Sequence, residues 1–468
     1  MVVGDIPTAT GLLVLGGGPA GYVAAIRAAQ LGLQVTLVEP ERVGGTCLNS
    51  GCIPLKAFLE AAAGARQVAR LAEMGVAAGP GRVDFARVRA WTASVVARLT
   101  GGVEQLLRAA GVQVVRGRGW FLGPTEVRVE GEHGSQRFTF DAALVATGAE
   151  PAAAGGLAVD GERVLTPQQA LALPELPAHL AVCGDDYVAL ELATAFRGLG
   201  SEVTLVLPGD QPLPDFEPAA VRQVVAGLKG QGIAVVPRAV LAGLDEAGLR
   251  WRSGGEEGVV AASHVVVAGA VRPRTAGLRL EAAGVRTGPD GAIAVDRAQR
   301  TSVPHIYAAG DVTGGPFLAH RAMLQARVAA ESAAGRAAAY EPQAVPQVVL
   351  TDPEVARVGM SAEEARQQGI DAVTARFPFG ANGRALTLGR PEGFVLVVAE
   401  RGSGVVLGVT VVGPRAAELI GEAALAVEMG ANLEDLAAVM HPHPGLGEAL
   451  QESAELALGR PVHVARLR

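Results

Sequence analysis

Two cysteines five positions apart are the residues of this sequence best suited to chemistry. Cys47 and Cys52 lie in residues 44–56, which read Gly-Gly-Thr-Cys-Leu-Asn-Ser-Gly-Cys-Ile-Pro-Leu-Lys. In a regular helix, residues five apart are separated by about 7.5 Å along the axis and about 140° around it, so a bond between these sulfurs requires a distorted turn. Asn49 and Gly51 permit such a turn. A strained, exposed disulfide is easily reduced, in contrast to a buried structural bridge.

Two other interpretations of the cysteine pair remain open from the residues alone. The pair could bind a metal, although no second pair of Cys or His stands at ligand spacing. The cysteines could also be two unrelated thiols. The third cysteine of the chain is Cys183, and three cysteines in 468 residues are too few for a framework of structural disulfides.

A glycine-rich turn upstream of the cysteines is typical of dinucleotide binding. Gly16, Gly18 and Gly21 follow an apolar run that predicts a strand and open an Ala-rich segment that predicts a helix. Such a turn brings backbone N–H groups and a helix N-terminus against a pyrophosphate, where a Cβ would obstruct the approach. Glu39 ends the next apolar run and is placed to accept a hydrogen bond from a ribose hydroxyl. The alternative is an ordinary tight turn in a glycine-rich chain.

The sequence resembles the FAD-dependent pyridine nucleotide-disulfide oxidoreductases of class I, and within them most closely the dihydrolipoyl dehydrogenases. The resemblance begins with the glycine turn and the cysteine segment. It continues, in order along the chain, through Ala146-Thr147-Gly148, residues 308–315 (Ala-Ala-Gly-Asp-Val-Thr-Gly-Gly), Ala319-His320 and residues 441–448 (His-Pro-His-Pro-Gly-Leu-Gly-Glu).

The resemblance implies that FAD is bound by residues scattered along the chain. Gly16, Gly18, Gly21 and Glu39 would hold the adenosine end, and Asp311 would hold the ribitol chain. The other positions implied to bind cofactor are Gly45, Thr46, Lys56, Gly119, Ala146, Thr147, Gly148, Ala319 and His320.

The resemblance also implies catalytic roles near the flavin. Cys47 would exchange with a dithiol substrate, and Cys52 would face the flavin and pass electrons to it. Lys56 would lie near the reactive nitrogen of the flavin, paired with Glu191. A compact ammonium group suits that role better than a planar guanidinium.

His443 and Glu448 resemble the acid–base pair of the family, in which the histidine takes the proton of the dithiol and the glutamate orients the ring. A thiolate is the attacking species, and a neutral imidazole near pH 7 is suited to generate it. The alternative is a surface histidine in a proline-rich loop. In the family arrangement, His443 reaches Cys47 of the partner subunit, which predicts a homodimer. His441 is expected to be structural.

A second strand–turn–helix–strand pattern begins near Leu180 and departs from the nucleotide-binding pattern. Gly184 opens its turn, but Asp186 replaces the middle glycine and would bring a carboxylate against a pyrophosphate. Leu207 ends the next strand, where an acidic ribose acceptor is expected. Ala270 replaces a glycine in a later turn. We therefore expect NAD binding through Gly184 to be weakened or lost, while the FAD and disulfide centre is intact.

The order of the predicted elements indicates an α/β fold with two Rossmann-like dinucleotide-binding domains and a C-terminal α+β dimerisation domain. We expect an FAD-binding domain at 1–150, an NAD-binding-like domain at 151–276, a return to the FAD side at 277–341 and a dimerisation domain at 342–468. Hydrophobic residues make up 49% of the chain and charged residues 19%, which suits several packed cores and excludes a disordered chain.

Charge and hydropathy restrict the partners. The net charge of −7, without a basic stripe, argues against binding of nucleic acid. The sequence contains no apolar run of about eighteen residues and no secretory pattern at its start, so neither membrane insertion nor export is expected and a cytoplasmic protein is predicted.

The expected function is FAD-dependent oxidation of dihydrolipoyl groups, with electrons passed to NAD⁺ if the second nucleotide site works. The resemblance implies lipoyl domains of 2-oxoacid dehydrogenase complexes as partners. One alternative keeps the chemistry but uses a different disulfide or an electron acceptor such as a quinone. A second alternative is a non-catalytic flavoprotein that serves as a redox-responsive subunit.

Overall fold

The computed structural model describes residues 6–77, 79, 82–132, 134–152, 157–269 and 271–465. Ala270, where the sequence indicates a lost glycine, lies outside the described residues. The chain divides into two compact units, each built from separated segments. Unit 1 comprises Met1–Ala57, Arg89–Ala153 and Ala270–Glu341, and unit 2 comprises Phe58–Val88, Ala154–Gly269 and Pro342–Arg468. The boundaries of the four predicted segments stay predictions.

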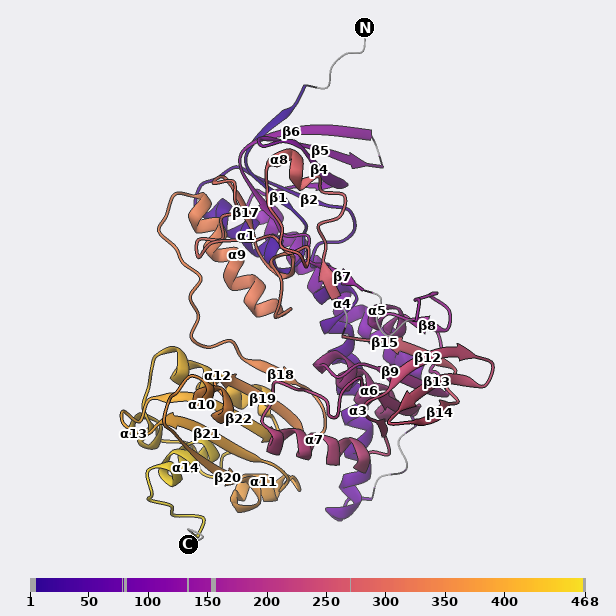
Figure 1. The fold of residues 1–468 in the computed structure, drawn as a ribbon, viewed down its shortest axis with the longest axis vertical. Coiled ribbons are helices and arrows are strands. Elements are labelled where there is room, and N and C mark those ends of the chain that lie inside the picture. Colours follow the sequence, from indigo (N-terminus) through magenta and orange to yellow (C-terminus); the bar gives the residue numbers. More distant parts are fainter. Residues whose placement is uncertain are drawn as a thin grey trace. The chain divides into compact units, whose positions relative to one another are not determined.

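Unit 1 is built on a seven-stranded sheet in the order β3-β2-β1-β6-β5-β4, with β17 also paired to β6. Its parallel strands are β1 (Thr8–Leu15), β2 (Val35–Glu39), β3 (Gln113–Arg116), β6 (Gly134–Val145) and β17 (Ile306–Ala308). An antiparallel extension is formed by β4 (Arg118–Gly123) and β5 (Glu126–Gly131). Helices α1 (Pro19–Gln30) and α9 (Ala319–Ala333) pack together against this sheet (Figure 1), where Arg27 and Glu331 form an ion pair of 2.6 Å.

Local sequence explains the β1–α1–β2 element. The apolar residues at the end of β1 are buried, as expected for a parallel strand covered on both faces. Pro19 occupies the first turn of α1, where its missing N–H group costs no hydrogen bond. Alanines and Gly21 form the buried face of α1, so the helix axis can approach the sheet closely. The same unit contains β7 (Ala149–Pro151), β16 (Val271–Pro273) and most of α4 (Phe85–Ala109).

Unit 2 contains a second parallel sheet, in the order β11-β10-β9-β15-β8. The strands are β8 (Val164–Leu165), β9 (His179–Cys183), β10 (Glu202–Val206), β11 (Ala234–Val236) and β15 (His264–Val267). Helix α6 (Tyr187–Leu199) connects β9 to β10, and α7 (Pro218–Gly230) connects β10 to β11. This is the second βαβ arrangement that the sequence predicts. A three-stranded sheet of β12 (Val240–Asp245), β13 (Gly248–Ser253) and β14 (Glu256–Val260) precedes β15.

The C-terminal part of unit 2 is an antiparallel sheet covered by helices. Its strands run in the order β18-β19-β22-β21-β20 and are β18 (Gln347–Val349), β19 (Glu354–Gly359), β20 (Ala372–Pro378), β21 (Phe394–Glu400) and β22 (Val406–Gly413). Helices α12 (Ala416–Glu428), α13 (Leu433–Ala438) and α14 (Glu448–Ala457), drawn in yellow tones in Figure 1, share a core with this sheet. Two Rossmann-like units and an α+β unit confirm the predicted fold class. Within the described ranges, no helix combines the length and apolar character needed to cross a membrane.

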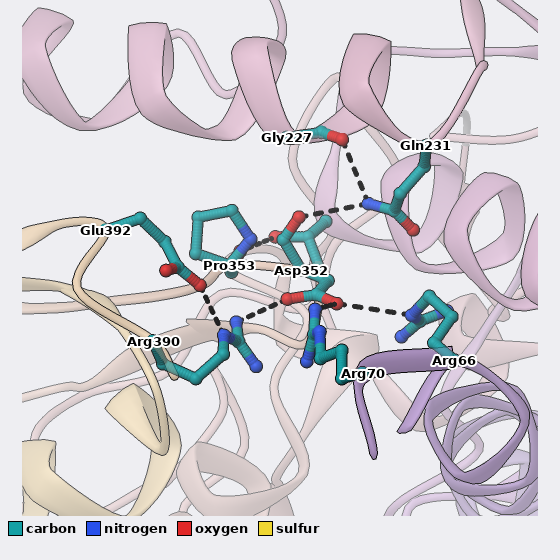
Figure 2. Close-up of polar contacts among 9 residues, drawn as sticks. Arg66, Arg70, Gly227, Gln231, Asp352, Pro353, Arg390 and Glu392 are labelled. Atoms are coloured by element: carbon teal, nitrogen blue, oxygen red, sulfur yellow. Dashed lines mark hydrogen bonds and ion pairs between the residues drawn. The ribbon is translucent and has the colours of Figure 1, made fainter. Parts of the chain in front are cut away.

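Asp352 joins three parts of unit 2 (Figure 2). Its carboxylate accepts hydrogen bonds from Arg66 Nε at 3.2 Å and Arg70 Nη2 at 2.7 Å, both on α3 (Cys52–Glu73). Arg390, which precedes β21, pairs with the other carboxylate oxygen. The Asp352 carbonyl accepts a hydrogen bond of 3.0 Å from Gln231 Nε2, directly after α7. One carboxylate, 11% exposed, therefore faces three guanidinium groups.

We predict that Asp352→Ala lowers the free energy of unfolding by about 3 kcal/mol, because the partly buried Arg66 and Arg70 lose their counter-charge and Arg390 keeps only its pairing with Glu392. Denaturant unfolding followed by tryptophan fluorescence measures the change. Asp371→Ala is the matched control, because Asp371 pairs with Arg401 and is 74% exposed, so its loss should change the midpoint little. Equal midpoints for the two variants would contradict the role given to Asp352.

Candidate active site

The turn between β1 and α1 leaves no room for a side chain at Gly16 or Gly21. Gly16 has a φ of +101°, and a Cβ there would lie 2.4 Å from the carbonyl oxygen of Ala146. A Cβ at Gly21 would lie 1.8 Å from the carbonyl oxygen of Gly16. Gly18 is the N-cap of α1 and has no side chain that could occupy the N–H groups of the first helical turn. These donors and the positive end of the helix dipole are therefore available to a phosphate.

Glu39 lies directly beside this turn, at the end of β2. The residue is 8% exposed, and its carboxylate accepts hydrogen bonds from the Gly17 N–H at 2.7 Å and the Glu41 N–H at 2.9 Å. Each carboxylate oxygen keeps a second lone pair that can accept a hydroxyl hydrogen. The turn and the fixed acid thus fit the pyrophosphate and ribose of the adenosine half of FAD.

Backbone contacts attach the cysteine segment to the same turn. The Gly44 N–H donates to the Gly17 carbonyl at 2.7 Å. A Cβ at Gly45 would lie 2.6 Å from the Cα of Gly18, so the start of α2 (Gly45–Asn49) lies against the phosphate-binding turn. The structure therefore brings the predicted cofactor residues and the predicted redox cysteines into one part of unit 1.

The predicted distortion between the cysteines is a break between two helices. Helix α2 ends at Asn49, Ser50 has φ −144° and ψ −1°, and α3 begins at Cys52. The Gly51 N–H donates to the Thr46 carbonyl oxygen at 2.7 Å, and a Cβ at Gly51 would lie only 3.1 Å from that oxygen. Asn49 fixes the start of the segment, since its side-chain amide donates to the Val43 and Gly45 carbonyls at 3.1 and 3.0 Å.

Cys47 and Cys52 are not joined by a disulfide in this structure, and they form a hydrogen bond with each other. That hydrogen bond, followed by burial, raises the pKa of Cys47, while the positive charge of Lys56 acts in the opposite direction. The Asp311 carboxylate also raises the pKa of Cys47, which places Asp311 in the same neighbourhood. Cys52 is thus the hydrogen-bond partner of Cys47, and the charges of Lys56 and Asp311 both act on Cys47.

Tyr22 is a neighbour of the redox centre that the sequence prediction missed. Burial, and then the charge of Cys47, raise the pKa of the Tyr22 hydroxyl. Tyr22 is the one aromatic residue of α1, which is otherwise made of small and aliphatic residues with one arginine and one glutamine. An aromatic residue in the first turns of an Ala-rich, nucleotide-binding helix is the signal that could have identified it.

The remaining predicted FAD positions are distributed over unit 1. Asp311 begins a 3₁₀ turn after β17; burial raises the pKa of its carboxyl, and Arg321 opposes the shift. Thr147 Oγ1 donates to the Arg274 carbonyl at 2.7 Å. Ala146 follows β6, Gly148 has a φ of +75°, and Ala319 and His320 begin α9.

Gly119 has a packing role in the structure. It lies on β4, where a Cβ would come within 2.8 Å of the Leu15 side chain. The Leu15 side chain of β1 therefore lies close to β4 at this position. Its role in cofactor binding stays a prediction.

The second βαβ unit differs from the first at its helix N-terminus. Gly184 has a φ of +152° and keeps the tight turn after β9. Asp186 is the N-cap of α6, and its own carboxylate accepts the Ala189 N–H at 2.9 Å. Leu207, directly after β10, is 1% exposed and has no acceptor group in its side chain. A dinucleotide therefore does not fit this unit in the way that it fits the first.

Glu191 is fixed within unit 2. The residue is 1% exposed, and its carboxylate accepts the Leu350 N–H at 3.0 Å. Its pairing with Lys56 stays a prediction.

His443 and Glu448 form the pair that the sequence predicts. His443 Nδ1 lies 2.5 Å from one Glu448 oxygen, and the Gly445 N–H donates to the other at 2.6 Å. Burial acts to raise the pKa of Glu448, but the hydrogen bonds from Gly445 and His443 hold it below its usual value. The His443 side chain is 80% exposed. A carboxylate on Nδ1 favours the tautomer in which Nε2 is the basic atom.

His441 is placed differently from His443. Its side chain is 7% exposed, and Nε2 lies 3.1 Å from the Glu422 carboxylate. The Nδ1 atom faces the Val439 carbonyl at 3.2 Å. These contacts support the structural role expected for His441.

Comparisons with known proteins identify the family. A family model described as "Pyridine nucleotide-disulphide oxidoreductase" matches residues 10–326, and the dimerisation domain of that family matches residues 345–454. The chain is 43% identical over 468 residues to the dihydrolipoyl dehydrogenase of Geobacillus stearothermophilus, covering 99% of each chain.

Two solved structures are also similar. LpdA of Mycobacterium tuberculosis has a TM-score of 0.88 and 31% identity, with 96% of this chain and 99% of that chain covered. RclA of Escherichia coli is a HOCl-induced flavoprotein disulfide reductase solved as a Cu(II) complex. It has a TM-score of 0.86 and 26% identity, with 96% of this chain and 99% of that chain covered. The predicted resemblance is confirmed. This chain belongs to the pyridine nucleotide-disulphide oxidoreductase family.

Proposed function

We propose that this chain is an FAD-dependent enzyme that oxidises dihydrolipoyl groups through Cys47 and Cys52. The observation that carries the proposal is the pair of adjacent thiols across the break between α2 and α3, beside the glycine turn of a dinucleotide-binding unit. Relatives named dihydrolipoyl dehydrogenase, aligned over nearly the whole chain, support the substrate. The family uses FAD and NAD, so NAD⁺ is the expected final acceptor.

The residues of unit 1 support FAD as the resident cofactor. The N–H groups at the start of α1 would take the pyrophosphate, Glu39 a ribose hydroxyl, and Asp311 the ribitol chain. When bound, FAD would accept two electrons from the reduced cysteine pair.

Cys47 and Cys52 would carry out dithiol–disulfide exchange with the substrate. In the oxidised enzyme, one sulfur of the dihydrolipoyl group attacks Cys47 as a thiolate, forms a mixed disulfide and releases Cys52 as the leaving thiolate. The second substrate sulfur then attacks the first and releases Cys47. The substrate becomes a cyclic disulfide, and its two electrons and two protons are transferred to the protein. Lys56 would favour the thiolate forms through its positive charge.

His443 would act as the base that removes the substrate protons. Its ring is oriented by Glu448 and exposed, as needed for contact with a group outside its own fold. The dimerisation domain supports a homodimer. We propose that His443 serves Cys47 of the partner subunit, so that the active site is complete only in the dimer.

Two further parts of the proposal rest on the family. The macromolecular partners would be lipoyl domains of 2-oxoacid dehydrogenase complexes, and the cytoplasmic location stays a prediction. Asp186 favours one alternative, in which electrons leave the flavin to an acceptor other than NAD⁺. The non-catalytic alternative is disfavoured by the intact thiol pair and the intact His443–Glu448 pair.

We predict that the purified holoenzyme oxidises dihydrolipoamide and that His443→Gln lowers kcat about 10²- to 10⁴-fold, because proton removal from the dithiol loses its base. Turnover is measured with NAD⁺ and, separately, with an artificial dye. His463→Gln is the matched control, because His463 Nδ1 makes a similar contact of 2.6 Å with Glu452. Glu452 lies on helix α14, the same helix as Glu448. Activity with the dye but not with NAD⁺ would support the alternative acceptor. Flavin binding with no activity in either assay would contradict the proposal.

We further predict that a mixed dimer of one Cys47→Ser subunit and one His443→Gln subunit recovers about half of the wild-type activity. Each homodimeric variant lacks one essential group at both sites. If His443 serves the other subunit, the mixed dimer retains one complete site. Differently tagged subunits, purified as the mixed dimer by two affinity steps, provide the measurement. An inactive mixed dimer would show that the histidine acts within its own subunit.

A further inference from the structure

The two βαβ units of this chain share one backbone framework, so each serves as an internal reference for the other. The Gly16 N–H donates to the Val38 carbonyl at 2.8 Å, and the Gly184 N–H donates to the Val206 carbonyl at 3.0 Å. In both turns a Cβ on the first glycine would strike a carbonyl oxygen of the neighbouring parallel strand, at 2.4 Å in the first unit and 2.8 Å in the second. The two turns therefore share these backbone contacts, and the differences that follow lie in side chains.

The main difference lies at the N-cap of the following helix. Gly18 and Asp186 have nearly the same backbone conformation, with φ and ψ of −70° and −174° at Gly18 and −87° and 177° at Asp186. At Gly18 the N–H groups of the first turn are left for a ligand. At Asp186 the carboxylate accepts the Ala189 N–H at 2.9 Å and also takes a backbone hydrogen bond from Val188. The second helix is thus capped by its own chain.

Charge around Asp186 adds to this difference. Burial raises the pKa of Asp186, and the neighbouring carboxylates of Asp185 and Glu191 raise it further. A pyrophosphate entering this turn would therefore meet a carboxylate at the helix N-cap itself, where the first unit has Gly18 and its carboxylate, Glu39, lies beside the turn. Gly269, after β15, also lies against Asp186, since a Cβ there would be 3.5 Å from the carboxyl carbon.

The ribose side of the second unit is changed as well. In the first unit Glu39 is held by the Gly17 N–H and offers free lone pairs. Leu207 takes the corresponding place after β10. Its side chain is buried, and its N–H donates to the Val236 carbonyl at 2.8 Å. The second unit has therefore lost the acidic acceptor as well as the open helix N-terminus.

We propose that Asp186 determines the nicotinamide nucleotide affinity of this enzyme by occupying the helix N-terminus that would otherwise bind the pyrophosphate. A nucleotide must displace the carboxylate from the Ala189 N–H or bind without that donor, and in both cases it approaches a like charge. The inference rests on the proposed function only for the identity of the nucleotide. NAD⁺ and NADH are bound weakly, while the dithiol half of the reaction is unaffected.

The test is a direct measurement of nucleotide binding by isothermal titration calorimetry under anaerobic conditions. NAD⁺ is titrated into the oxidised holoenzyme, and NADH is titrated into the holoenzyme reduced by a dithiol. We expect Asp186→Gly to bind both nucleotides about ten- to a hundredfold more tightly than the wild type, since the competing carboxylate is removed. Asp186→Asn keeps an oxygen for the Ala189 N–H and removes only the charge, so it should show a smaller gain. It also preserves the helix cap if the glycine variant folds poorly.

Asp185→Asn is the matched control, because it removes a neighbouring charge without altering the helix cap. Unchanged affinity in both Asp186 variants, or an equal gain in Asp185→Asn and Asp186→Asn, would overturn the inference. Flavin reduction by dihydrolipoamide, measured on the same samples, separates the two proposals. If dihydrolipoamide fails to reduce the flavin while nucleotide affinity responds to Asp186, the proposed function fails and the inference stands. If dihydrolipoamide reduces the flavin but nucleotide affinity does not respond to Asp186, the inference fails and the proposed function stands.

Discussion

The break in helical structure between Asn49 and Cys52 is the feature on which the candidate redox centre depends. In one continuous helix, the two sulfurs would point in different directions. The backbone instead leaves helical geometry at Ser50, and the Gly51 N–H returns to the Thr46 carbonyl oxygen. Helix α3 can then begin with Cys52 in hydrogen-bond contact with Cys47. Glycine at position 51 provides space for this return, because a Cβ would crowd the carbonyl oxygen.

The same close approach of backbone segments connects the thiols to the nucleotide turn. The Gly44 N–H donates to the Gly17 carbonyl. A Cβ at Gly45 would lie 2.6 Å from the Cα of Gly18, so a side chain at position 45 would not fit between the two segments. Movement of the cysteine segment would therefore disturb the glycine turn that is predicted to bind phosphate. This packing connects the predicted adenosine end of the cofactor site to the two thiols within unit 1, whereas in unit 2 the N-terminus of α6 is capped by Asp186.

Features encoded by neighbouring residues could be predicted from the sequence. The β1–α1–β2 element follows from an apolar run, a glycine turn and a helical segment, and the structure has all three. The contact between His443 and Glu448 was predictable because the residues are five positions apart and match a specific motif. Asp186 was recognised as an unfavourable charge, but its role as the N-cap of α6 required the backbone geometry.

Contacts between distant segments could not be predicted from local pattern. Asp352 meets Arg66 across 286 positions, and no spacing rule connects them. Tyr22 was missed because its neighbour Cys47 belongs to another helix. The close approach of the Leu15 side chain on β1 to Gly119 on β4 likewise joins distant segments, and the cofactor role of Gly119 stays a prediction. Each of these depends on tertiary packing, which one sequence does not reveal.

The most direct measurement of the central claim is the visible absorption spectrum of the purified protein before and after anaerobic addition of dihydrolipoamide. We predict a yellow flavoprotein that develops a long-wavelength band when the dithiol reduces the cysteines, because a Cys52 thiolate then lies against the flavin. Cys52→Ser should bind flavin and lack this band. A colourless protein that cannot be reconstituted with FAD, or a flavoprotein whose spectrum the dithiol does not change, would contradict the claim.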